Sequence, residues 1–111
     1  MYTINPRVAL QNNILLNYFN SNSVTLEELC EAVKTSMYVF EELKLEVIKR
    51  EGETEINFIE VDEFSSVLIL TIYLNSKNEI KLVERDMSIV TPANKLMTLF
   101  LGSLIDKRVE L

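Results

Sequence analysis

The residues best suited to chemistry in this chain are its carboxylates. Three of them could form an acid–base pair or hold Mg²⁺, namely Glu41, Glu42 and Glu46, and three could bind Ca²⁺, namely Glu60, Asp62 and Glu63. Paired acid–base chemistry needs two carboxylates held across a cleft, and a calcium loop needs alternating ligands with a glycine at the bend. Neither pattern is evident, so we expect solvated surface here and no metal site.

The remaining reactive residue types are few. The chain has no histidine, and Cys30 is its one cysteine, so no Ser-His or Cys-His nucleophile pair and no intramolecular disulfide can form. Only Gly52 and Gly102 exist to build a loop around a phosphate, and no nucleotide-binding motif appears. We therefore predict a protein that binds rather than catalyses, without a cofactor.

Composition and charge limit the number of domains, the location and the class of partner that we expect. The 111 residues, 48% of them hydrophobic, fit a single domain spanning residues 1–111. No apolar run is long enough to cross a bilayer and residues 1–10 do not look like a signal peptide, so a cytoplasmic protein with no membrane partner is expected. The net charge of −6 disfavours a non-specific grip on nucleic acid, which draws its affinity from Lys and Arg.

The elements that must position these residues begin with three predicted helices. Pro6–Asn20 carries an apolar stripe, and a polar break follows it. Thr25 and Glu28 form a capping box, which predicts a second helix from Leu26 to about Lys34. A third apolar stripe predicts a helix over residues 37–49, although Leu45 falls off that stripe. Residues 6–50 are thus expected to form a helix-turn-helix.

The second half of the chain is expected to be a wing followed by a helix. Residues 55–85 change to a two-residue periodicity and form β-strands, with a hairpin turn at residues 75–78. Residues 91–107 form a C-terminal helix that is apolar around most of its circumference. Such a helix is either buried or shared, so Leu96, Phe100 and Leu104 are candidates for contacts in a homodimer. The predicted fold class is α+β, a winged helix-turn-helix.

The local sequence supports a family resemblance over roughly residues 10–50. Leu15-Leu16-Asn17-Tyr18-Phe19 and the segment from Val24 to Val33 resemble the first DNA-binding domain of Mga-type regulators of Gram-positive bacteria. The resemblance implies a winged helix-turn-helix that reads double-stranded DNA. Its groove-facing candidates are Lys34, Thr35, Ser36, Tyr38 and Lys44, with Lys77 and Lys81 as wing contacts to phosphates. A cap followed by a solvated face is the alternative interpretation of these residues.

The charge of the predicted recognition helix conflicts with that function. Glu41 or Glu42 stands where the family tends to carry Arg, and residues 27–55 hold nine acidic against four basic residues. Two adjacent carboxylates repel a phosphate-lined groove. We therefore expect a transcription-regulator-like protein whose DNA binding is weak, partner-dependent or lost. The alternative is a small acidic inhibitor or adaptor, of the phage or plasmid type, that presents Glu27, Glu31, Glu41 and Glu42 to a basic protein.

Overall fold

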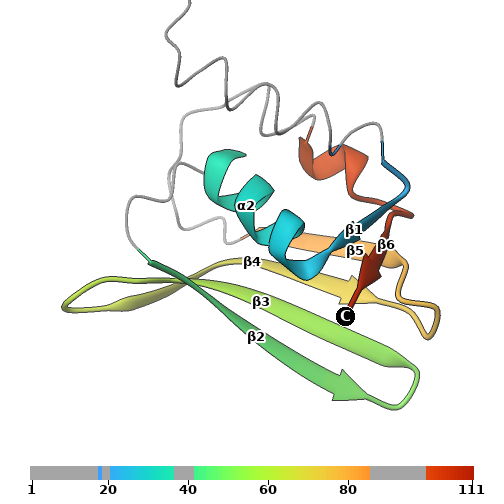
Figure 1. Ribbon diagram of the computed structural model, residues 1–111. Coiled ribbons are helices and arrows are strands. Elements are labelled where there is room, and N and C mark those ends of the chain that lie inside the picture. Colours follow the sequence, from blue (N-terminus) through green and yellow to red (C-terminus); the bar gives the residue numbers. More distant parts are fainter. Residues whose placement is uncertain (1–17, 19–20, 37–41, 86–99) are drawn as a thin grey trace, which may run out of the picture.

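The computed structural model describes residues 18, 21–36, 42–85 and 100–111 (Figure 1). A four-stranded antiparallel sheet dominates this part of the chain, in the order β2-β3-β4-β5. Its strands are β2 (Glu42–Arg50), β3 (Glu53–Val61), β4 (Ser66–Leu74) and β5 (Ile80–Arg85). Each strand follows its neighbour in sequence, so the sheet is a meander with short connections.

Short polar turns set the register of the sheet. Gly52 reverses the chain between β2 and β3 with φ of +77°, a conformation that glycine adopts without a steric penalty. Between β4 and β5, the Asn75 side chain accepts the backbone N–H groups of Lys77 and Glu79, both at 2.9 Å. Asn78 takes the left-handed conformation with φ of 63° in the same turn. This is the hairpin turn expected at residues 75–78.

One helix and a small parallel strand pair complete the described fold. α2 (Leu26–Ser36) begins where Thr25 Oγ1 accepts the backbone N–H of Glu28 at 3.2 Å, so the predicted cap is confirmed. β1 (Ser23–Thr25) pairs in parallel with β6 (Arg108–Glu110). β6 is also joined to the start of β5, because Arg108 forms an antiparallel bridge with Glu79. Next to it, Ile80 donates its backbone N–H to the carbonyl of Lys107 at 2.9 Å.

The hydrophobic core lies between α2 and one face of the sheet. Figure 1 shows α2 and the helical turn of residues 100–103 on the same side of the four strands. The fully buried side chains come from α2, β3, β4, β5 and the segment that starts at Phe100, whereas Leu43 and Leu45 of β2 are partly buried against them. The largest fully buried side chains are Leu29, Ile56, Phe58, Leu70, Ile72, Leu74, Ile80, Phe100 and Leu104. Phe100 also meets Tyr18 edge to face, with ring centroids 5.2 Å apart.

The predicted three-helix winged helix-turn-helix is wrong. Residues 42–49, expected within a third helix, belong to the edge strand β2, so there is no recognition helix at that position. The stretch Glu42-Leu43-Lys44-Leu45-Glu46-Val47 alternates polar and apolar residues, and this period of two places its apolar side chains on one face of a strand. The described fold is mostly β, with α2 as its one helix of more than a single turn.

The other predicted helices fall partly outside the described residues. Of residues 6–20 only Tyr18 is described, so that prediction is not addressed. Of residues 91–107, the segment 91–99 lies outside the description and residues 100–103 are helical. The chain then turns and enters β6, where a continued helix was expected. No helix in the described segments is long and apolar enough to span a bilayer.

Candidate binding surface on the open face of the sheet

The sheet has a second face, opposite the core, on which none of the described elements outside the sheet packs (Figure 1). We call it the open face. Strand alternation and register assign its members, with a bulge between Phe58 and Ile59 that shifts β4 by one residue. They are Glu42, Lys44, Glu46, Ile48 and Arg50 of β2, Glu53, Glu55, Asn57, Ile59 and Val61 of β3, Ser66, Leu68, Thr71 and Tyr73 of β4, and Leu82 and Glu84 of β5.

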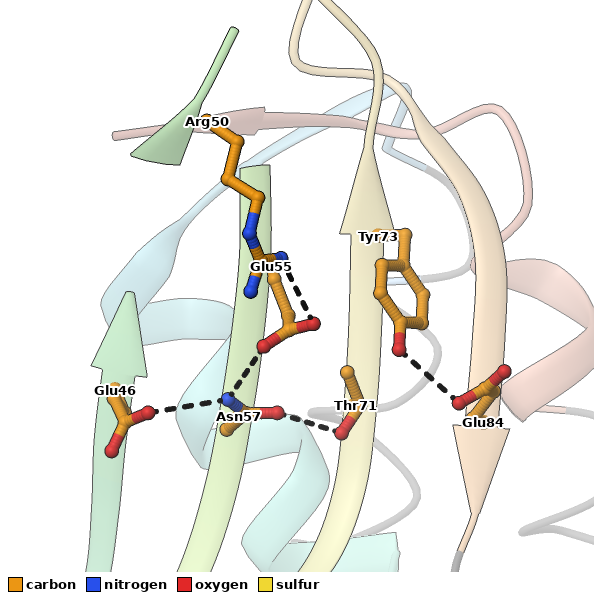
Figure 2. Close-up of polar contacts among 7 residues, drawn as sticks. All are labelled: Glu46, Arg50, Glu55, Asn57, Thr71, Tyr73 and Glu84. Carbon is orange, nitrogen blue, oxygen red and sulfur yellow. Dashed lines mark hydrogen bonds and ion pairs between the residues drawn. The ribbon is translucent and has the colours of Figure 1, made fainter. Parts of the chain in front are cut away.

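A buried polar pair occupies the centre of the open face (Figure 2). Thr71 donates its hydroxyl hydrogen to Asn57 Oδ1 at 2.7 Å, and the two side chains are 6% and 9% exposed. Asn57 Nδ2 in turn donates to Glu55 Oε2 at 3.1 Å and, at the longer distance of 3.5 Å, to Glu46 Oε1. The pair therefore helps to position two carboxylates, of which Glu46 is exposed and Glu55 is half-buried.

Glu55 is held as an anion by its neighbours. Arg50 forms an ion pair with it at 3.3 Å, across the β2–β3 hairpin. The hydrogen bond from Asn57 and the charge of Arg50 lower the pKa of the Glu55 carboxyl below its ordinary value of 4.5. The consequence for the surface is that Arg50 is already engaged, and its charge offsets that of Glu55.

Tyr73 and Glu84 extend the polar network to the opposite edge strand. The Tyr73 hydroxyl donates to Glu84 Oε2 at 3.3 Å, as Figure 2 shows. Partial burial and the nearby Glu84 carboxylate raise the pKa of the Tyr73 phenol, so it stays protonated and acts as a donor. The Glu84 carboxylate keeps one oxygen free of any described protein partner.

The open face as a whole is acidic with apolar side chains between the charges. Its five carboxylates outnumber its two cations, Lys44 and Arg50. Leu68 and Leu82 are 44% and 48% exposed. Beyond the face, Phe64 is 93% exposed at the tip of the β3–β4 turn. Apolar anchors surrounded by charge are typical of surfaces that bind other proteins.

The predicted DNA-contact residues are not gathered into one surface. Lys34, Thr35 and Ser36 end α2 on the core side of the sheet, whereas Lys44 lies on the open face. Lys34 lies 3.9 Å from the Glu31 carboxylate, and Lys81 forms a 2.9 Å ion pair with Asp106. Lys77 is exposed in the β4–β5 turn, and Tyr38 lies outside the described residues.

The predicted acidic set is also divided between two sides of the molecule. Glu27 and Glu31 are exposed on α2, whereas Glu42 lies on the open face and Glu41 falls outside the description. The predicted dimer contacts are placed differently again. Phe100 and Leu104 are fully buried within the core of one chain, and Leu96 is not among the described residues.

The remaining polar clusters have local structural roles. Asp62 Oδ1 accepts the backbone N–H groups of Phe64 and Ser65, both at 2.7 Å, so it shapes the β3–β4 turn. Cys30 is half-buried on α2, and its desolvation raises the pKa of the thiol. Within the described segments, no three His, Cys, Asp or Glu side chains are placed to hold a metal ion.

Most residues of the open face were not predicted from the sequence. Glu55, Asn57, Tyr73 and Glu84 were not singled out, because their proximity depends on pairing between strands. Part of the sequence pattern did indicate a strand at residues 42–47. Leu45 did not fit the helical stripe, and the alternation from Glu42 to Val47 would have placed Glu42, Lys44 and Glu46 together on one face of a strand.

Comparison with known proteins adds no constraint on this surface. No family model, no curated protein and no solved structure matches the chain.

Proposed function

We propose that this protein is a non-catalytic binding protein that engages a basic protein partner through the open face of its sheet. The observation that carries the proposal is the composition of that face, with five carboxylates against two cations and exposed leucines among them. Carboxylates attract a cationic partner over several ångströms and orient it on approach. The apolar side chains then supply the contacts that exclude water.

The buried Asn57–Thr71 pair supports a preorganised surface. Because Asn57 donates to Glu46 and Glu55, these carboxylates lose little conformational freedom when a cationic side chain arrives. Arg50 offsets part of the charge of Glu55, which leaves the acids at the edges of the face as the stronger attractors. The acids on α2 do not share this arrangement, since they lie on the other side of the sheet.

A DNA-reading function has less support. β2 occupies the place of the expected recognition helix, and the cationic candidates are spread over two faces or held by carboxylates. Binding to duplex DNA is therefore the alternative that the experiment below distinguishes.

The experiment is affinity capture from a lysate of cells in which the protein occurs, followed by reconstitution with the purified partner. Wild type is compared with Glu53→Gln/Glu84→Gln on the open face and with Glu27→Gln/Glu31→Gln on α2, which removes the same charge elsewhere. We expect one basic protein, released by high salt, whose capture falls with the open-face variant alone. Equal capture by both variants, or tight and salt-steep binding to duplex DNA, would contradict the proposal.

A further inference from the structure

The two edges of the four-stranded sheet differ in a way that points to a second interface. At the β5 edge, the chain after the helical turn forms hydrogen bonds with the outer backbone groups of Ile80. The Ile80 N–H donates to the Lys107 carbonyl, and the Ile80 carbonyl accepts from the Asp106 N–H at 2.8 Å. At the β2 edge, no described residue pairs with the outer side of the strand. β2 is nine residues long, and an open edge of this length is a template for another strand.

The residues that offer hydrogen bonds at this edge follow from the hairpin. Arg50 and Glu53 flank a two-residue turn, so they exchange their backbone hydrogen bonds with each other. Hydrogen-bonded pairs alternate along an antiparallel ladder, so even-numbered residues of β2 bond to β3. The backbone groups of Leu43, Leu45 and Val47 therefore point outward from the sheet.

We infer that a second copy of this chain pairs with β2 in antiparallel fashion, with the two-fold axis at Leu45. In that register Lys44 faces the second copy's Glu46, and the symmetry repeats the pair. On the core side of the sheet, Leu43 faces the second copy's Val47, and Leu45 faces its own equivalent. Opposite charges and apolar residues thus meet their complements across the new ladder.

Neighbouring registers either shorten the paired segment or bring like charges together. A shift of the axis to Leu43 keeps Glu42 opposite Lys44, but it pairs only residues 42–44 of the two β2 strands, whereas the axis at Leu45 pairs residues 42–48. A shift of the axis to Lys44 brings the two copies' Lys44 together and places Glu42 opposite Glu46. A shift to Glu46 places Glu42 opposite Arg50 but brings the two copies' Glu46 together at the axis. A shift to Val47 places Lys44 opposite Arg50. Like charges directly opposite destabilise a strand pair, so among registers that pair seven or more residues of each β2, the axis at Leu45 is the one that avoids such contacts.

The inferred dimer joins two open faces into one continuous acidic surface, and it does not depend on what that surface binds. The interface consists of two strand edges and the side chains beside them, of which Val47 is 38% exposed. That is a small contact, so we expect a weak dimer whose formation depends on concentration.

The test combines mass measurement with amide exchange on the full chain. Analytical ultracentrifugation over a concentration series gives the dimer dissociation constant for wild type, Lys44→Glu, Glu46→Lys and the double swap. Each single variant places like charges opposite each other twice and should weaken the dimer by about tenfold, whereas the double swap should restore it. A circular dichroism melt of each variant checks that the fold is retained.

Amide exchange reads the register directly. Protection of the Leu43, Leu45 and Val47 amides should rise with protein concentration, while the Lys44 and Glu46 amides are protected at every concentration. A wild-type protein that stays monomeric at about 1 mM would overturn the inference. A dimer that is insensitive to both single variants would overturn it equally, as would concentration-dependent protection elsewhere with none at these three amides.

Discussion

Thr71 and Asn57 face each other across β3 and β4 on the open face, joined by a 2.7 Å hydrogen bond although no described element covers them. Replacing either residue by valine leaves the other buried without its hydrogen-bond partner. A buried donor or acceptor without a partner costs about 1–3 kcal/mol. We expect Thr71→Val and Asn57→Val each to lower the free energy of unfolding by that amount. Urea denaturation of each single variant provides the measurement.

The double variant Asn57→Val/Thr71→Val separates the hydrogen bond from burial. With both residues apolar, neither leaves a buried polar group without a partner. The double variant should therefore lose less stability than the sum of the two single losses. Valine also suits a strand. A strictly additive double-mutant cycle would show that the pair makes no contribution as a unit.

Thr25 caps α2 through its side chain, which accepts the Glu28 backbone N–H at 3.2 Å. We expect Thr25→Ala to lower the free energy of unfolding by about 1 kcal/mol, since an N-cap hydroxyl contributes on that scale. Thr25→Ser keeps the hydroxyl and serves as the control, so it should lose less. Thermal melts of the three proteins make the comparison, and equal losses for Ala and Ser would rule out the cap as the cause.

Capping and turn residues such as Thr25 and Asn75 are also what the sequence could predict correctly. Their hydrogen bonds reach only three or four residues along the chain, so local sequence determines them. The third helix was predicted wrongly because Val39, Phe40, Leu43 and Val47 fit a helical spacing by chance. Pairing between β2 and β3, which decided the structure there, is a tertiary contact that overrides local preference.

The candidate surface was harder to predict than the fold. Glu46, Asn57, Thr71 and Glu84 belong to four different strands and meet only because their register aligns them. The bulge between Phe58 and Ile59 changes that register, and no turn residue marks it in the sequence. In the same way, the pairing of Val24 with Val109 joins opposite ends of the chain and has no local signature.

Asp62 should make the free energy of unfolding depend on pH in the acid range. The Phe64 and Ser65 amides hydrogen-bond to it and lower its pKa below the ordinary value of 3.8. A carboxyl group whose pKa is lower in the folded than in the unfolded chain stabilises the fold at pH values above its unfolded-state pKa. This stabilisation is lost as the pH falls through the folded-state pKa. We expect Asp62→Asn to be less stable than wild type at pH 7, with a difference that shrinks below about pH 4. Urea denaturation at both pH values measures it, and a constant difference would contradict the assignment.

Phe100 belongs to the core of one chain, where it is fully buried against Tyr18. Phe100→Ala should therefore cost about 3–5 kcal/mol, the range for removing a buried aromatic ring. The loss should be the same at low and high protein concentration, because the ring is not at an interface between copies. A loss that depends on concentration in urea denaturation would instead place Phe100 at such an interface.

Phe64 separates binding from stability. Its side chain is 93% exposed on a turn that Asp62 holds rigid, so Phe64→Ser should change the free energy of unfolding by less than about 0.5 kcal/mol. If the turn supplies an apolar anchor beside the open face, the same variant should weaken partner binding about tenfold or more. Leu111→Ser, also exposed but at the chain end, is the control in isothermal titration calorimetry and should bind as wild type does.

The most direct test of the central claim is the association rate of the protein with its purified basic partner, measured by stopped flow at low and moderate salt. The claim predicts that Glu53→Gln/Glu84→Gln slows association and flattens its salt dependence, because these carboxylates steer the partner toward the open face. Glu27→Gln/Glu31→Gln, with the same net charge, should associate at nearly the wild-type rate. Equal slowing by both variants would mean that net charge alone attracts the partner, and slowing by the α2 variant alone would place the binding surface on the helix.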